Sequence, residues 1–168
     1  MIDYTQFREL VVVPTLECLN NRIGYSEEAV DLLMMTAAHE SKGGTYLKQV
    51  GGPALGMYQM EPETEEDIWE NYLDYRPSLS AYVFNMRGKR LVAPPLATNF
   101  VYATAMARVH YFRVPQPLPE RSRFLPEEHA EEEYLRELAM YAKAHYNTHL
   151  GKATPESYYR DFLRWRDS

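Results

Sequence analysis

The sequence of 168 residues contains a single cysteine, Cys18, so it can form no internal disulfide. Cys18 lies in an apolar stretch of an expected helix, which predicts a buried packing residue and not a catalytic thiol. No run approaches the roughly 18 apolar residues that cross a bilayer, so we expect no membrane insertion. The 18 Lys and Arg are scattered, against 24 Asp and Glu. Because no basic block could neutralise a phosphate backbone, we expect no nucleic-acid partner.

Several recognisable signals are also missing. The chain opens without the charged and then apolar pattern of a signal peptide, so we expect synthesis in the cytoplasm without one. No phosphate loop, nucleotide fingerprint or cysteine-rich zinc spacing occurs. His145 and His149 are four residues apart, but no third metal ligand accompanies them. We therefore expect no metal and no cofactor.

The overall composition is that of a folded protein. Hydrophobic residues make up 45% of the chain and charged residues 25%, with a net charge of −6. The length fits one domain spanning residues 1–168. Fourteen tyrosines offer flat surfaces that suit sugars, although most are expected in the core.

Hydrophobic spacing predicts a mainly α fold, of the α+β kind, with about six or seven helices and at most a small β-hairpin. Ser26 is an expected N-cap for a helix over 27–41. Pro62 fits the start of a helix that ends before Pro77. Residues 78–94 fit either a hairpin or more helix. Further helices are expected over 3–20, 98–113, 127–147 and from Pro155 onward. In the first of these, the candidate buried positions are Phe7, Leu10, Val11 and Leu16.

Glu40 is the candidate catalytic residue. On the helix over 27–41 it lies beside Leu33 and Ala37, at the edge of the apolar face. Burial and the negative end of the helix dipole both disfavour a carboxylate there, so we predict a raised pKa for Glu40. A carboxyl that keeps its proton can act as the general acid that glycosidic cleavage requires. The alternative is a solvated glutamate at a helix end.

A glycine-rich loop over residues 42–61 follows Glu40 and leads to Gln59. Gly51, Gly52 and Gly56 let the backbone approach a ligand closely. The amide of Gln59 can both donate and accept hydrogen bonds with sugar hydroxyl or acetamido groups. A ligand-binding loop beside the candidate acid is one interpretation, and an ordinary connecting loop is the other.

Three motifs resemble those of soluble lytic transglycosylases, which belong to the lysozyme-like superfamily. The pair Glu40-Ser41 resembles their catalytic Glu-Ser pair. The segment 56–60, with Pro62 and Thr64, is similar to their Gly-Leu-Met-Gln-x-x-Pro-x-Thr segment. Residues 144–147, followed by a glycine at 151, resemble a spaced-out Ala-Tyr-Asn-Ala-Gly motif. The longer stretch around the second motif also resembles small bacteriophage-encoded members.

This resemblance implies a substrate, a reaction and a set of site residues. Glu40 would protonate the oxygen between N-acetylmuramic acid and N-acetylglucosamine in peptidoglycan, and then accept a proton as a 1,6-anhydro ring closes. The implied substrate-binding residues are Ser41, Gly56, Tyr58, Gln59, Tyr146 and Asn147. The partners would be bacterial glycan strands and, for a phage virion component acting on the cell wall, other virion proteins.

Three alternatives remain open at this point. A hydrolytic muramidase would use a second carboxylate, for which Glu61 and Glu63 are the candidates, although acidic residues at a helix start are commonly structural. A non-catalytic virion protein could keep the fold and grip glycan. A plain helical assembly module would leave Glu40 exposed, with no groove beside it.

Overall fold

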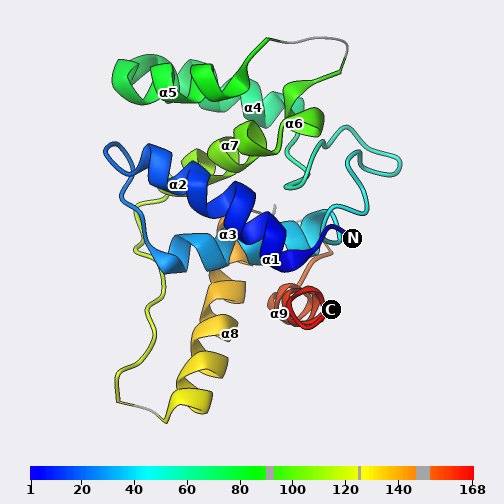
Figure 1. Ribbon diagram of the computed structural model, residues 1–168, viewed down its shortest axis with the longest axis vertical. Coiled ribbons are helices and arrows are strands. Elements are labelled where there is room, and N and C mark those ends of the chain that lie inside the picture. The colour runs from blue at the N-terminus through cyan, green and yellow to red at the C-terminus, as the bar shows by residue number, and fades with distance from the viewer. Residues whose placement is uncertain (90–92, 125, 147–151) are drawn as a thin grey trace.

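The computed structural model describes residues 1–89, 93–124, 126–146 and 152–168 (Figure 1). The prediction of a mainly α fold with at most a small β element is confirmed. Within these residues β pairing is limited to the bridges Lys48–Leu55 and Leu55–Met60. The helices are α1 (Tyr4–Phe7), the π-helical turn η1 (Arg8–Val12), α2 (Val13–Leu19), α3 (Glu27–Glu40), α4 (Pro62–Asn71), the 3-10 turn η2 (Leu73–Tyr75), α5 (Pro77–Arg87), α6 (Pro95–Thr98), α7 (Phe100–Phe112), α8 (Glu127–His145) and α9 (Pro155–Arg166).

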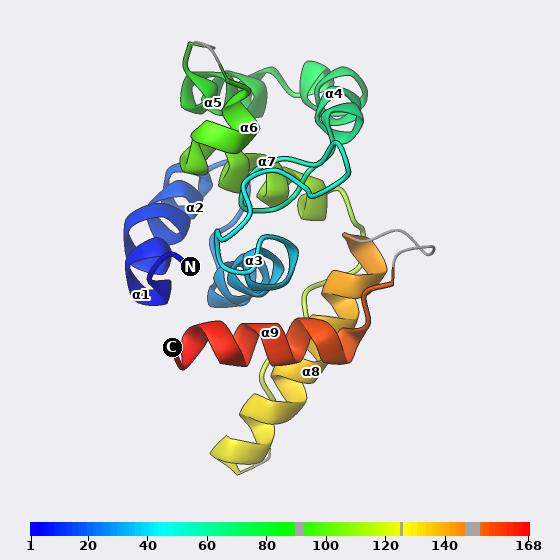
Figure 2. The ribbon, with the colours of Figure 1, turned by 90° about the vertical axis from the view of Figure 1, so that its right-hand side faces the viewer.

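Helix α3 is the centre of the fold. The hydroxyl of Ser26 accepts a hydrogen bond from the Ala29 amide and so caps its first turn, as predicted. Every α3 residue from Leu32 to Ala38 is buried, so these two turns are covered on all sides, as expected of a central helix. Helix α9 crosses α3 and packs on both α3 and α8 (Figure 2). Glu40 therefore lies where the central helix leaves the core.

Two hydrophobic clusters share helix α7. One face of α7 contributes Ala103, Ala107 and Tyr111 to a cluster formed with α3, α8 and α9. The other face contributes Tyr102 and Met106 to a cluster with α4, α5 and α6. Figure 1 shows this second group stacked above α7 and the first below it. Because one helix belongs to both clusters, the upper helices are held in a fixed position relative to Glu40.

The N-terminal helix differs from its prediction. Its middle turn is π-helical, so the buried positions step from Phe7 to Val12 and then to Leu16. The extra residue in that turn shifts the phase of the helix, and Leu10, predicted to be buried, is 70% exposed. The same shift leaves Cys18 exposed, which corrects the prediction that it is buried.

The segment over 78–94, which fitted either a hairpin or more helix, is described in part. Residues 77–87 form α5, so the helical alternative is correct for this part, and residues 90–92 lie outside the described residues.

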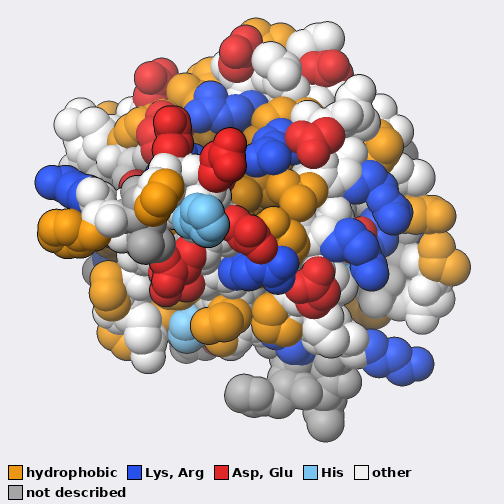
Figure 3. All heavy atoms as spheres, turned by 90° about the horizontal axis from the view of Figure 1, so that it is seen from below, with side chains coloured by type: hydrophobic (Ala, Val, Ile, Leu, Met, Phe, Trp, Pro, Cys, Tyr) orange, Lys and Arg blue, Asp and Glu red, His pale blue; other side chains and the backbone are white. Residues whose placement is uncertain are grey.

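Helix α8 ends at His145, and its N-terminal half projects beyond the body of the molecule (Figure 1). Seen from that end, acidic and basic side chains are interspersed (Figure 3), which agrees with the ion pairs that Arg136 makes with Glu132 and Glu156. Along the described parts of the chain, every helix is too short or too polar to cross a bilayer.

Candidate active site

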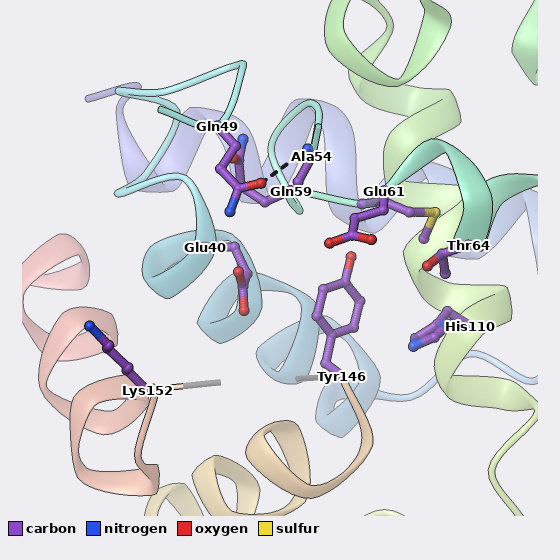
Figure 4. Close-up of a pocket in the computed structure, with 10 residues that line it drawn as sticks. Glu40, Gln49, Ala54, Gln59, Glu61, Thr64, His110, Tyr146 and Lys152 are labelled. Carbon is purple, nitrogen blue, oxygen red and sulfur yellow. Dashed lines mark hydrogen bonds between the residues drawn. The ribbon is translucent and has the colours of Figure 1, made fainter. Parts of the chain in front are cut away.

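A cavity of about 440 Å³ opens at the C-terminal end of α3 (Figure 4). One side, which we call the helical wall, consists of Glu40, Tyr146 and Lys152, at the ends of α3, α8 and the approach to α9. The other side comes from the loop before α4 and the first turn of α4, and we call it the loop wall. The loop wall consists of Gln49, Ala54, Gln59, Met60, Glu61 and Thr64. His110 of α7 completes the lining.

The Glu40 carboxyl is largely buried in the helical wall. Burial raises its pKa, against the opposing effects of a hydrogen bond from Tyr158 and of the charges on Lys42 and Lys143. The Tyr158 hydroxyl donates to Glu40 Oε1 at 2.5 Å. The predicted direction of the Glu40 pKa is therefore confirmed. Burial beside a cavity also contradicts the alternative of an exposed glutamate in a plain assembly module.

A polar cluster lies directly behind Glu40. Asp161 of α9 uses one oxygen, Oδ2, to accept from both His39 Nδ1 at 2.7 Å and Lys42 Nζ at 2.6 Å. The ring of His39 stacks on the ring of Tyr158, with centroids 4.0 Å apart. Burial alone would raise the pKa of Asp161, but the hydrogen bonds from Lys42 and His39 lower it overall. Burial lowers the pKa of His39.

Tyr146 forms the part of the helical wall opposite this cluster. Its hydroxyl donates to the Tyr58 carbonyl at 2.8 Å, and its ring packs against Tyr111 and His110. Burial, with a further contribution from the charge of Glu40, raises its pKa well above the usual value. Tyr146 therefore lies near Glu40, but its hydroxyl donates its hydrogen bond to the loop backbone and not to the Glu40 carboxyl. The hydroxyl that contacts the acid is that of Tyr158, which nothing in the sequence distinguished from the other apolar positions of α9.

Three of the predicted substrate-binding residues lie outside the cavity lining. Ser41 is fully buried, and its hydroxyl donates to the Ala37 carbonyl and accepts from the Gly44 amide, so it caps α3. Tyr58 is buried, and its hydroxyl pairs with that of Thr104. Gly56 has a φ of +78°, and a Cβ atom there would lie 1.8 Å from the Leu96 carbonyl oxygen. These residues shape the loop wall from behind and present no side chain to the cavity.

Two glutamine side chains do reach the cavity. Gln59 was predicted to contact substrate, and its Nε2 donates to the carbonyls of Tyr46 and Gly56. Its Oε1 is then the part of the amide left to accept a hydrogen bond from a ligand. Gln49 accepts from the Ala54 amide across the turn of the loop. Its place in the cavity was not predicted, nor were those of His110 and Lys152, because residue type and spacing gave no signal for them. Thr64 also lines the cavity; it was part of the second motif but was not named as a substrate contact.

The two candidates for a second carboxylate separate clearly. Glu61 lines the cavity, and its carboxyl points in from the loop wall (Figure 4). Glu63 is exposed and lies outside the lining. The remaining predicted contact, Asn147, lies outside the described residues, as does Gly151.

Histidine 110 has a structural role in the lining. Burial and the nearby Arg113 charge lower its pKa to about 4, so it is neutral at physiological pH. Its Nδ1 lies 3.0 Å from the guanidinium of Arg113. In the part of the chain that the structure describes, no three His, Cys, Asp or Glu side chains are arranged to hold a metal ion, and His149 lies outside that part.

No protein-family model, curated protein or solved structure matches this chain. A fold by itself does not define an activity, so we infer the function from the chemistry of the cavity and from the three motifs.

Proposed function

We propose that the protein is a peptidoglycan-cleaving glycosidase, and specifically a lytic transglycosylase with Glu40 as general acid and base. The observation that carries this proposal is the Glu40 carboxyl: largely buried, raised in pKa, and set in the wall of an open cavity. A carboxyl with these properties keeps its proton at a pH where an exposed glutamate has lost it. Delivery of that proton to a leaving oxygen is the first requirement of glycosidic cleavage.

The geometry supports a two-step use of Glu40. Because Tyr158 donates to Oε1, the acid proton belongs on Oε2. Transfer of this proton to the bridging oxygen breaks its bond to C1 of the muramic acid residue and leaves an oxocarbenium-like centre. The C6 hydroxyl oxygen then bonds to C1, and its proton returns to Glu40, which closes the 1,6-anhydro ring. Between the steps, the Tyr158 hydroxyl and the Lys42 charge stabilise the carboxylate.

The loop wall supplies contacts for the sugar rings. Gln59 Oε1 can accept from an acetamido N–H or a hydroxyl group of the glycan. Its Nε2 is fixed by two loop carbonyls, so the acceptor is held in place before substrate binds. The glycan strands of bacterial peptidoglycan are the proposed partner, with other virion proteins as further partners if the enzyme is carried by a phage particle.

A hydrolytic muramidase is the second candidate function, and Glu61 is the observation that favours it. Its carboxyl reaches the same cavity from the opposite wall (Figure 4). A second carboxylate there can position a water molecule or stabilise the positive centre. The two functions differ in their products, since hydrolysis leaves a reducing end and transglycosylation leaves an anhydro ring.

The test is digestion of purified peptidoglycan of several chemotypes, with the products identified by mass spectrometry. The variants are Glu40→Gln, Glu61→Gln and, as a matched control, Glu63→Gln, which removes an exposed carboxyl outside the cavity. We expect anhydro-muropeptides from the wild type and a loss of about 100- to 10,000-fold in Glu40→Gln, the usual contribution of a general acid. We expect the other two variants to retain activity.

Two other outcomes of the digestion would support a different function. Reducing-end products that depend on both Glu40 and Glu61 would replace the transglycosylase with a muramidase. A folded wild type that binds glycan but releases no product from any chemotype would refute the catalytic proposal and favour the non-catalytic virion protein.

A further inference from the structure

Lys42 occupies an unusual position for a lysine. It follows the end of α3 and has a φ of +53°, in the left-handed region that favours glycine. Glycine is the common choice just after a helix, and Gly43 and Gly44 follow here with positive φ as well. The backbone at this point therefore favours glycine, and the reason for a lysine must lie in its side chain.

The Lys42 ammonium is bound by a buried carboxylate. Its Nζ donates to Asp161 Oδ2 at 2.6 Å, and Asp161 is only 7% exposed. The same oxygen accepts from His39, whose ring stacks on Tyr158, and Tyr158 donates to Glu40. Asp161 is thus connected to Glu40 by two routes. One runs through the Lys42 ammonium, and the other runs through the stacked rings of His39 and Tyr158.

Charged and titratable groups face Glu40 from every element packed around it. Lys42 follows α3, Lys143 lies on α8 and Tyr158 on α9, and these three lower the pKa of Glu40. The hydroxyls of Tyr111 on α7 and Tyr146 at the end of α8 also interact with the Glu40 charge. The cavity lining adds His110, Lys152 and Glu61. Among these groups Lys42 is the cation that Asp161 binds directly, so Asp161 can control how close that charge comes to Glu40.

We propose that Asp161 is a positioning residue that holds the Lys42 ammonium against α9, away from the Glu40 carboxyl, and so keeps the acid protonated. Lys42 already lowers the pKa of Glu40 through its charge while Asp161 holds it. Without Asp161 the ammonium would be released to move closer to the Glu40 carboxyl, and an opposite charge at contact distance favours the ionised form. This inference rests on the proposed function only in treating Glu40 as the acid. Its physical content, the protonation of Glu40, can be measured without any substrate.

The experiment is a titration of glutamate side-chain carboxyls by ¹³C NMR, with the Glu40 resonance identified by its disappearance in Glu40→Gln. We expect Asp161→Asn to lower the pKa of Glu40, because Lys42 is released, and Lys42→Gly to raise it, because the cation is gone. Lys42→Arg keeps a cation that can pair with Asp161 and should leave the wild-type titration. Lys89→Met, which removes an exposed lysine two residues after the end of α5, controls for net charge.

The double variant Asp161→Asn, Lys42→Gly separates the two routes. If Asp161 acts through Lys42, the double variant titrates like Lys42→Gly alone. If the Asp161 substitution lowers the pKa of Glu40 equally in both backgrounds, Asp161 acts directly or through Tyr158, and the proposal is wrong. An unchanged titration in either single variant also overturns it. Lys42→Gly relieves the left-handed backbone, so it keeps the test available even if Asp161→Asn does not fold.

Peptidoglycan digestion over a pH series then connects this result to the proposed function. A general acid loses activity as the pH rises through its pKa, so this limb should move to lower pH in Asp161→Asn and to higher pH in Lys42→Gly. Opposite shifts of Glu40 by NMR without any digestion by the wild type would support the inference and refute the glycosidase. Digestion with an unshifted Glu40 titration would do the reverse.

Discussion

The two walls of the cavity place a carboxyl in very different surroundings. Glu40 on the helical wall ends a helix that is buried from Leu32 to Ala38, accepts a hydrogen bond from Tyr158 and has a raised pKa. Glu61 on the loop wall is exposed and directly precedes the first residue of α4, where the helix dipole suits negative charge. Paired carboxyls in contrasting environments are the usual basis for dividing acid and charged roles within one site.

The walls also differ in what holds them in place. The helical wall belongs to the hydrophobic cluster shared by α3, α8 and α9, which surrounds Glu40 with apolar packing. The loop wall has almost no regular secondary structure and depends on backbone conformations at Gly51, Gly56 and Gln59, all with positive φ. We therefore expect substitutions in the helical wall to alter chemistry, and substitutions in the loop wall to alter stability first.

The largest effect on stability is expected for Gly56→Ala in the loop wall. The new Cβ atom would lie 1.8 Å from the Leu96 carbonyl oxygen, a backbone atom that cannot move aside cheaply, and alanine is strained at a φ of +78°. Overpacking and left-handed strain together should lower the free energy of unfolding by about 3 kcal/mol. Chemical denaturation followed by circular dichroism measures this loss.

Substitutions at two other glycines distinguish the steric clash of a new Cβ atom from the strain of a left-handed backbone. Gly51 has a φ of +75° but open space around its Cβ position, so Gly51→Ala should cost about 1 kcal/mol from strain alone. A Cβ atom at Gly24 meets nothing within 4 Å, so Gly24→Ala should change stability by no more than about 0.5 kcal/mol. If all three variants lost the same stability, the close contact between Gly56 and α6 would not be what fixes the loop wall.

Much of the helical wall was predictable from the sequence, and little of the loop wall was. The N-cap at Ser26 and the apolar spacing after it defined α3, and its dipole and apolar edge gave the direction of the Glu40 pKa. Those signals are local, so they are visible along one helix. The hydroxyl that donates a hydrogen bond to Glu40 belongs to Tyr158, which lies 118 residues further along the chain. No local sequence pattern indicates such a contact.

The positions at which the structure differs from the sequence predictions also depend on contacts that are not local. Ser41 and Tyr58 fit a motif for substrate binding, but tertiary packing buries both side chains behind the cavity. Leu10 followed an ideal helical repeat, which the π-helical turn interrupts by one residue. Periodicity and motif spacing thus locate elements well, whereas the direction in which a loop side chain points depends on what the rest of the chain places behind it.

A smaller effect, of opposite sign, is expected for Glu40→Gln. The folded protein raises the pKa of Glu40, so the stability that this carboxyl contributes is present below its ordinary value of 4.5 and is lost as the pH rises through the folded pKa. A neutral amide avoids the cost of burying the charge. Glu40→Gln should therefore be more stable than the wild type above the folded pKa, by about 1 kcal/mol, and near-equal at low pH.

Thermal unfolding over a pH series measures this difference. Glu61→Gln serves as the matched variant on the opposite wall, and its curve subtracts the general effect of removing one negative charge. A Glu40→Gln curve that runs parallel to the wild type at every pH would mean that the two walls do not differ as the structure indicates.

The smallest effect is expected for Tyr158→Phe, which removes one oxygen from behind the helical wall. The Tyr158 hydroxyl donates to the carboxylate form of Glu40 and so opposes the effect of burial. Its loss should raise the pKa of Glu40 and lower the free energy of unfolding by about 0.5–1 kcal/mol. The high-pH limb of the digestion profile should move to higher pH, while a purely structural tyrosine would reduce activity equally at every pH. Tyr159→Phe is the matched control, since that ring packs on the guanidinium of Arg136. A shift in the profile for Tyr158→Phe alone would show that the helical wall sets the protonation of Glu40 through a specific donor in addition to its apolar packing.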